Sequence, residues 1–240
     1  LAAKEEAEAP EALALSSGVI SDPSLQRLCQ RAVDLGISVN SIVEMAEQEL
    51  QRIPPRWIGN QWILFSDRID GSRSTLQKQL KRYADVALSM ILLILCSPLL
   101  ALAGLLVKCQ DGGPVFYRQQ RSGLLGNPFE VVKIRTMTTN AEASGAQWSQ
   151  ADDPRITPVG RWLRRTRIDE IPQLFNVLRG EMSLIGPRPE RPELDQELEN
   201  MIPNYRLRHW IRPGLSGWAQ VNLPYSSSFE EAELKLSYDL

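Results

Sequence analysis

Two adjacent acids, Asp169 and Glu170, lie within a stretch, residues 161–191, that also contains seven arginines. Arginine side chains bind phosphate oxygens in a bidentate manner, and a carboxylate surrounded by positive charge has a lowered pKa and stays ionised. An ionised carboxylate can attack phosphorus or hold Mg2+. The alternative is a solvated helix with surface ion pairs, because blocks of surface charge are common.

Proline alternates with charge just downstream, in the segment GPRPERP at residues 186–192. Proline fixes φ, so this backbone is stiff and extended. Arg188 and Arg191 therefore project from a support that loses little entropy when they bind an anion. The pattern favours a site for phosphate over a merely solvated surface.

Three ordered motifs resemble a known family. They are IDEIPQLFNVLRGEMSLIGPRPE at 168–190, IRPGLSGWAQVN at 211–222 and KRYADVALSMILLILCSPLLALAGLLVK at 81–108. Together they resemble the bacterial sugar transferases called monotopic phosphoglycosyl transferases, from about Lys81 to the last residue. The resemblance implies transfer of a sugar 1-phosphate from a nucleoside diphosphate sugar to polyprenyl phosphate, the step that initiates exopolysaccharide, capsule or other glycoconjugate assembly.

The resemblance also implies residue roles. Asp169 is expected to be the nucleophile that forms a covalent phosphosugar-aspartate, and Glu170 the ligand of a Mg2+ cofactor. Further cations are expected to offset the charge of the phosphates, namely Arg164, Arg188, Lys133 and Arg135. Asn176, seven residues after Asp169 and on the same helical face, orients a phosphate oxygen or caps a neighbouring turn.

One motif departs from the family pattern. Many members have Asn-Gly-Arg after WAQV, with an arginine that binds phosphate, whereas this chain has Asn222-Leu223-Pro224. That contact is absent or replaced here. For His209, a hydrogen-bonded structural residue is the expectation and a catalytic base the alternative.

Residues 86–107 form an uncharged run of 22 residues, long enough to cross a membrane. Pro98 removes a backbone donor near its centre, and the Ser97 hydroxyl can cap the freed carbonyl, so a break is expected there. Positive charge, including Lys81 and Arg82, flanks both ends, whereas a simple span keeps its positive excess on one side. We therefore predict a re-entrant helix-break-helix in the inner leaflet of the bacterial inner membrane, in preference to a buried core helix.

The predicted fold is mainly α with a small β-hairpin, an α+β arrangement in which the catalytic domain faces the cytoplasm. Residues 1–72 are expected to be a linker and helical segment left from a longer chain, 73–110 the membrane hairpin, and 111–240 a catalytic domain truncated at its C-terminus. The remaining local expectations are helices within 21–36 and 41–51, a strand or interfacial segment at 56–70, a hairpin over 115–139, a helix at 161–178 interrupted near Pro172, and helices at 203–211 and 230–239.

Charge and composition narrow the partners. Residues 1–72 carry six basic and eleven acidic side chains, and 73–240 carry 21 and 18, so the basic part contains the motifs. Three dispersed cysteines and a single histidine do not make a usual zinc site. No motif supports nucleic-acid binding or a P-loop kinase. The rivals left open are a membrane-anchored scaffold that binds anionic lipid and a Mg2+-dependent phosphatase, and a homodimer is possible.

Overall fold

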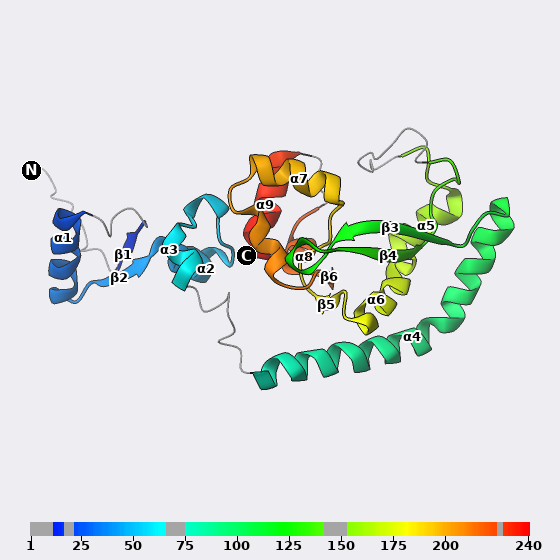
Figure 1. Ribbon diagram of the computed structural model, residues 1–240, viewed down its shortest axis with the longest axis horizontal. Coiled ribbons are helices and arrows are strands. Elements are labelled where there is room, and N and C mark those ends of the chain that lie inside the picture. Colours follow the sequence, from blue (N-terminus) through cyan, green and yellow to red (C-terminus); the bar gives the residue numbers. More distant parts are fainter. Residues whose placement is uncertain (1–11, 17–21, 66–74, 142–152, 225–227) are drawn as a thin grey trace, which may run out of the picture.

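The computed structural model describes residues 12–16, 22–65, 75–141, 153–224 and 228–240, and shows an elongated molecule with the N-terminal elements at one end (Figure 1). Those elements are β1 (Ala12–Leu15), α1 (Pro23–Asp34), β2 (Ser38–Ser41), α2 (Ile42–Leu50), the short 3-10 helix η2 (Pro55–Trp57) and α3 (Asn60–Phe65). The long α4 (Thr75–Asp111) leads into β3 (Phe116–Ser122), η3 (Leu124–Gly126) and β4 (Pro128–Ile134). The rest are α5 (Pro158–Thr166), η4 (Ile168–Gln173), α6 (Leu174–Arg179), β5 (Ser183–Ile185), α7 (Pro192–Met201), η5 (Tyr205–Trp210), β6 (Gly214–Ser216), α8 (Trp218–Asn222) and α9 (Phe229–Asp239).

Several local predictions are confirmed. Asp22 caps α1 by accepting from Ser24 N at 2.8 Å, and Ser41 with Glu44 forms a capping box at the start of α2. Strands β3 and β4 pair antiparallel in full register, which is the expected hairpin. The final helix α9 is also present.

Other local predictions are right only in part. Within residues 56–70, the strand alternative is wrong, because η2 and α3 are helical there, and a short aromatic run does not distinguish strand from helix. The helix expected at 161–178 is interrupted around Pro172, as predicted, but it is divided into three elements, α5, η4 and α6. The helix expected at 203–211 is a 3-10 helix at 205–210. Two short parallel pairs, β1 with β2 and β5 with β6, were not expected.

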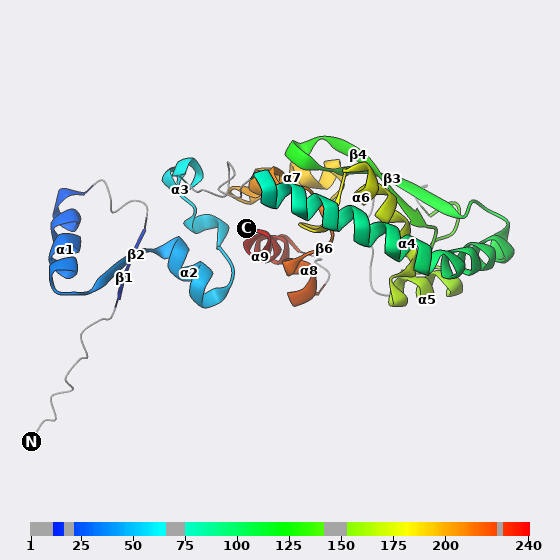
Figure 2. The same cartoon turned by 90° about the horizontal axis from the view of Figure 1, so that it is seen from below.

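Helix α4 runs continuously through Pro98, contrary to the predicted break, and Figures 1 and 2 show that the helix is bent. The Ser97 hydroxyl donates to Ile94 O at 2.8 Å, the carbonyl that Pro98 leaves without a backbone donor. That bond satisfies the freed carbonyl, so helical hydrogen bonding continues through the bend. The capping role expected of Ser97 is thus confirmed.

The apolar surface of α4 is mostly uncovered. By length and composition it is able to cross a membrane, with mean hydropathy 2.7 in its most apolar window, of which only 17% is buried within the described protein. The two side chains just before Cys96, Ile94 and Leu95, are 72% and 69% exposed. Within the described residues, α4 is therefore not a buried core helix.

Both arms of α4 nevertheless contact the same globular part. In the first arm, Arg82 donates to the carbonyls of Val177 and Leu178 at 2.6 and 2.8 Å, at the end of α6. Lys81 donates to Ser183 Oγ, and thereby contacts β5. The predicted cations before the apolar run, Lys81 and Arg82, thus donate hydrogen bonds to other parts of this protein. In the second arm, Ala103 and Val107 pack in a core cluster with Ile134, Leu163 and Ile168.

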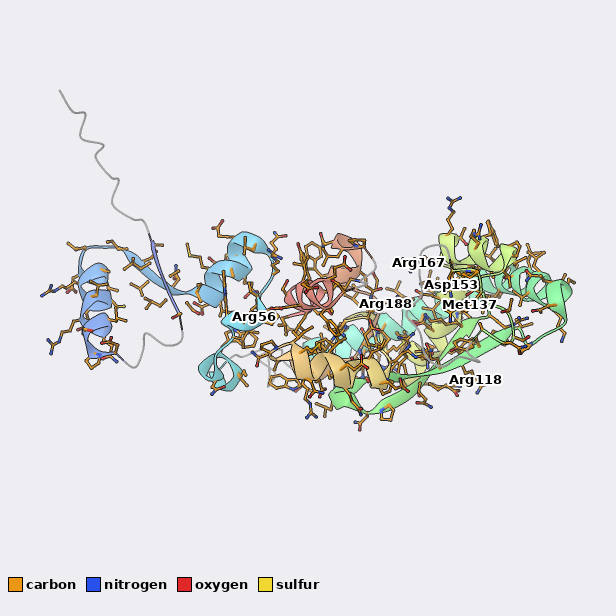
Figure 3. All side chains as sticks on the ribbon, turned by 90° about the horizontal axis from the view of Figure 1, so that it is seen from above. Arg56, Arg118, Met137, Asp153, Arg167 and Arg188 are labelled. Carbon is orange, nitrogen blue, oxygen red and sulfur yellow. The ribbon has the colours of Figure 1, made fainter. Side chains whose placement is uncertain are left out.

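The N-terminal elements are attached through residues 51–63. Val43, Ile53 and Ile58 form a buried cluster with Leu207 of η5, and Ile53 N donates to Ser237 O of α9 at 2.7 Å. Arg56, which Figure 3 labels on this side of the molecule, forms an ion pair with Glu233 at 2.6 Å. This attachment joins the N-terminal elements to α9 and η5, which lie behind the site described next.

Candidate active site

A tight turn between α5 and η4 places the acidic pair. Arg167 ends α5 in the left-handed conformation, with φ of 59°, and the chain re-enters a helical turn at Ile168. Ile168 is buried in the cluster formed with α4, β4 and α5. Because the residue before the pair is anchored in the core, Asp169 and Glu170 are only 7% and 8% exposed as residues.

Glu170 is held by cations from three elements. Its Oε1 accepts from Lys133 Nζ of β4 at 2.9 Å and from Arg188 Nη2 of the loop after β5 at 2.6 Å, and its Oε2 lies 3.9 Å from Arg167 Nη1. Figure 3 labels Arg188 and Arg167, which lie in different parts of the chain. Burial by itself raises the pKa of Glu170, but Lys133 and Arg188 outweigh it and hold that pKa well below its usual range. Glu170 is therefore ionised, as the sequence predicts.

Asp169 has a different environment. Its Oδ1 is buried and, among the described residues, has no hydrogen-bond partner. Burial and then the negative charge of Glu170 raise the pKa of Asp169 to about 6, although Lys133 and Arg164 act in the opposite direction. The lowered pKa expected for both acids is thus wrong for Asp169, because burial contributes more than the surrounding cations. Two adjacent carboxylates with opposite pKa shifts are typical of acids with different chemical roles.

Three of the predicted cations are at the site. Lys133 and Arg188 contact Glu170 directly, as described above. Arg164 donates through Nε to Thr136 Oγ1 at 2.9 Å, and its charge lowers the pKa of Asp169. These three side chains surround the acidic pair from α5, β4 and the proline-rich loop.

Two other predicted residues are not brought to the acidic pair. The buried Arg135 guanidinium forms an ion pair with Asp111 and donates to the carbonyls of Pro114 and Met137 at 2.6 and 3.1 Å, so it fixes the end of α4 to β4. Asn176 is fully buried, and its Nδ2 donates to Glu130 O and Glu181 Oε2, both at 2.7 Å. Of the two roles considered for Asn176, the structure favours the structural one.

The sequence reasoning missed part of the site. A narrow cleft beside Glu170 is lined by Arg121, Val131, Lys133, Gln173, Arg188 and Pro189. Gln173 follows Asp169 by four residues, is buried, and has an Nε2 with no hydrogen-bond partner among the described residues. Gln220, from the WAQVN motif, accepts from Arg188 Nη1 at 3.2 Å. The four-residue spacing on one helical face was the available signal for Gln173.

The acidic pair offers carboxylate oxygens, the ligand type that Mg2+ prefers in proteins. Glu170 Oε2 has only longer contacts, 3.4 Å to Arg188 and 3.9 Å to Arg167, and Asp169 Oδ1 has no hydrogen-bond partner among the described residues. Within the described ranges, no group of three acidic, cysteine or histidine side chains could hold a metal ion. Mg2+ usually keeps several waters and uses one or two carboxylates plus substrate phosphates. Two carboxylates therefore fit a metal that shares its ligands with a diphosphate.

His209 lies in a separate buried cluster. Its Nε2 is 3.7 Å from Asp195 Oδ2, and its ring packs edge-on against Tyr205. Burial lowers the pKa of His209, with Asp195 acting in the opposite direction. The structure thus favours the structural role over a catalytic base.

The comparisons with known proteins agree with this arrangement. The family model described as bacterial sugar transferase matches residues 76–240, more than half of the chain. The chain belongs to the bacterial sugar transferase family. The match includes both arms of α4, the acidic pair and the loop that carries Arg188.

Three relatives illustrate the similarity. Over 160 residues the chain is 43% identical to the UDP-N-acetylgalactosamine-undecaprenyl-phosphate N-acetylgalactosaminephosphotransferase of Aeromonas hydrophila, covering 67% of this chain and 38% of that protein. It is 39% identical over 173 residues to the UDP-glucose:undecaprenyl-phosphate glucose-1-phosphate transferase of Escherichia coli, covering 71% and 37%. A protein of the same name from Caulobacter vibrioides is 48% identical over 141 residues, covering 59% and 53%. The chain thus spans less than two fifths of the length of the first two relatives.

Proposed function

We propose that this protein transfers a sugar 1-phosphate from a nucleoside diphosphate sugar to polyprenyl phosphate. The observation that carries the proposal is the buried Asp169 carboxyl group, whose Oδ1 has no hydrogen-bond partner among the described residues, next to a Glu170 that Lys133 and Arg188 hold. The names of the relatives, all undecaprenyl-phosphate sugar phosphotransferases, support the same reaction. Three cations line the narrow cleft, Arg121, Lys133 and Arg188, and their charge matches that of phosphate groups.

In the first half of the reaction, Asp169 attacks the phosphorus that bears the sugar. A bond forms between a carboxylate oxygen and this phosphorus, and the bond to the bridging oxygen of the diphosphate breaks. The nucleoside monophosphate leaves with that electron pair. Because burial raises the pKa of Asp169 to about 6, the carboxylate is ionised at neutral pH and only weakly solvated, which favours attack.

In the second half, an oxygen of polyprenyl phosphate attacks the same phosphorus and displaces the Asp169 carboxylate. The product is a polyprenyl diphosphate sugar, and Asp169 returns to its initial state. Each step brings an anion to an anionic centre. Lys133, Arg164 and Arg188, which converge on the acidic pair, offset that repulsion.

We further propose Mg2+ as the cofactor, with Glu170 as its main protein ligand. When bound, the metal would neutralise charge on the diphosphate oxygens. Glu170 is suited to this role because Lys133 and Arg188 keep it ionised, while its Oε2 has only the longer contacts. Arg188 also orients Glu170 through the 2.6 Å hydrogen bond to Oε1.

We propose that α4 enters the inner leaflet of the bacterial inner membrane and returns, with the catalytic part on the cytoplasmic face. Arg82 before the apolar run and Asp111 after it both bond to one globular part, through α6 and Arg135. A straight span would separate these flanks by a hydrocarbon core of about 30 Å. The bend at Pro98 and the exposed Ile94 and Leu95 beside it support insertion of the middle of α4.

The direct test is a panel of nucleoside diphosphate sugars, each incubated with the membrane-bound protein and polyprenyl phosphate. We expect release of nucleoside monophosphate for at least one donor. More than one turnover per enzyme is expected only when the lipid phosphate is present. Release that continues without lipid phosphate would favour the phosphatase alternative, in which water attacks the aspartyl phosphate. No release with any donor, while anionic lipid still binds, would favour the scaffold alternative.

A further inference from the structure

The loop that carries Arg188 is fixed through four consecutive carbonyl groups. Prolines at 187 and 189 have no N–H, so the loop relies on its carbonyls for anchoring. These carbonyls accept from two backbone amides and two arginine side chains: Pro187 O from Gly214 N at 2.8 Å, Arg188 O from Arg208 Nη2 at 2.9 Å, Pro189 O from Arg121 Nη1 at 3.1 Å, and Glu190 O from Ser122 N at 2.9 Å. The bond to the carbonyl of Arg188 itself comes from Arg208.

Arg208 is a buried arginine of η5, 8% exposed, whose guanidinium is shared among three elements. Besides Arg188 O, it donates to Tyr205 Oη and, through Nη2, to Asp239 Oδ2 of α9 at 3.2 Å. Tyr205 Oη in turn donates to Asp195 Oδ1 of α7 at 3.0 Å. These contacts immobilise the guanidinium, so its position relative to the loop is well defined.

The two ends of Arg188 therefore have different partners. Its carbonyl accepts from Arg208, and its guanidinium donates to Glu170 Oε1 at 2.6 Å and to Gln220 Oε1 at 3.2 Å. Moving the backbone of Arg188 would move the cation that holds Glu170. The planar fork of the arginine donates to a carbonyl, a carboxylate and a hydroxyl in fixed, well-separated directions. The compact ammonium of a lysine at 208 would not match all three.

We infer that Arg208 is a positioning residue for the transfer reaction: through the carbonyl of Arg188 it sets where the Arg188 guanidinium meets Glu170. The inference rests on the proposed function. Arg208 does not contact the acidic pair and acts on it only through Arg188.

A double-mutant cycle between residues 208 and 188 tests this role. Single-turnover formation of nucleoside monophosphate from radiolabelled donor is measured for wild type, Arg208→Lys, Arg188→Ala and the double variant, so that slow variants remain measurable. A displacement of a catalytic group by about 1 Å can lower the rate about 100-fold. Arg208→Lys is therefore expected to lower the rate by about 10- to 100-fold. In the Arg188→Ala background the same change is expected to cost less than about threefold, since the residue it acts through is gone.

A merely structural loss would lower the rate by the same factor in both backgrounds, and that result would overturn the inference, as would a wild-type rate for Arg208→Lys. Arg206→Lys is the matched control, because Arg206 lies on the same 3-10 helix but is exposed and pairs only loosely with Glu199, at 3.8 Å. It is expected to retain the wild-type rate. Asp169→Asn separates the two proposals: turnover in that variant would defeat the proposed function, whereas an inactive Asp169→Asn with an unaffected Arg208→Lys defeats only the positioning role.

If Arg208→Lys does not fold, the cycle is repeated with Arg208→Met in an Asp239→Asn background, and Asp239→Asn alone is the reference. This pair removes one buried charge of each sign, and the remaining acid, Asp195, keeps the hydrogen bond that Tyr205 Oη donates to it. The methionine keeps the apolar stem but cannot donate to Arg188 O. The same non-additivity with Arg188→Ala is expected, and equal losses in both backgrounds would again overturn the inference.

Discussion

Replacing Asp169 with asparagine is expected to stabilise the fold while abolishing turnover. The pKa of Asp169 is raised from 3.8 to about 6, mainly by burial. At about 1.4 kcal/mol per pKa unit, the ionised carboxylate costs the folded state about 3 kcal/mol. Asparagine has the same shape and no charge, so it avoids this cost but cannot act as the nucleophile.

The sign of the pH dependence follows from the raised pKa. The protonated group favours the folded state below pH 3.8, and this benefit is lost as the pH rises through 6. The advantage of Asp169→Asn over wild type should therefore be absent below pH 3.8, about half developed at pH 5 and complete above pH 6 to 7. For a chain of this size, about 3 kcal/mol corresponds to an increase of roughly 6–12 °C in the unfolding midpoint.

The assay is thermal unfolding of detergent-solubilised protein, followed by tryptophan fluorescence at one scan rate from pH 4 to pH 8. Asp111→Asn is the control of opposite sign, because the hydrogen bond from Arg135 lowers the pKa of Asp111 to about 2. Asp111→Asn is expected to lower the unfolding midpoint at neutral pH, because it leaves the buried Arg135 guanidinium without its carboxylate partner. Equal midpoints for wild type and Asp169→Asn at pH 8, or a lower one for the variant, would refute the reasoning about burial.

Three further outcomes are expected. Glu170→Gln should lower the rate by about two orders of magnitude or more, with partial recovery at higher Mg2+, and wild-type activity in excess chelator would exclude a metal role. Replacing Ser97-Pro98 with Ala-Leu should straighten α4, so that cysteines placed before and after the apolar run, which label from the same side in the native sequence, label from opposite sides in part of the mutant population. Same-side labelling in both proteins would show that the bend does not decide topology. His209→Gln should keep the rate within about tenfold and leave its pH profile unchanged, because a general base typically contributes 10²–10⁴-fold, whereas a larger loss with a shifted profile would make His209 a catalytic base.

The sequence predicted the composition of the site better than its electrostatics. The motif at 168–190 located the acidic pair and Arg188, and the wider resemblance from about Lys81 onward pointed to Lys133 and Arg164. It did not predict the raised pKa of Asp169, since the burial of a side chain depends on which helices cover it. Here Ile168 packs against α4 and draws the next residue below the surface.

Residues remote from the motif's centre were harder to place. Lys133 and Arg135 are two residues apart, a spacing that puts side chains on the same face of a strand. Strand β4 ends at Ile134, however, and Arg135 just beyond it pairs with Asp111, whereas Lys133 pairs with Glu170. Asn176 shares a helical spacing with Asp169, but η4 and α6 are separate elements and the amide turns toward β4.

The same limits apply to the fold. The hairpin and the capped helices were predictable because turn residues and caps act locally. Pairs such as β5 with β6 are only three residues long, which is too short for alternation to be recognised. The break predicted at Pro98 became a bend because Ser97 supplies the missing donor. The sequence identified Ser97 and Pro98. It did not show whether the donor that Ser97 supplies outweighs the donor that Pro98 removes.

Intact-mass analysis shows whether Asp169 forms a covalent bond to the phosphosugar. Wild-type protein and Asp169→Asn are incubated with a nucleoside diphosphate sugar and Mg2+, without polyprenyl phosphate, and then quenched in acid. We expect a wild-type adduct with the mass of the sugar phosphate, mapped to Asp169, that disappears when polyprenyl phosphate is added, and no adduct on the variant. An unmodified wild-type protein that nevertheless turns over once lipid phosphate is supplied, or an adduct of the same mass on Asp169→Asn, would contradict covalent bonding at Asp169.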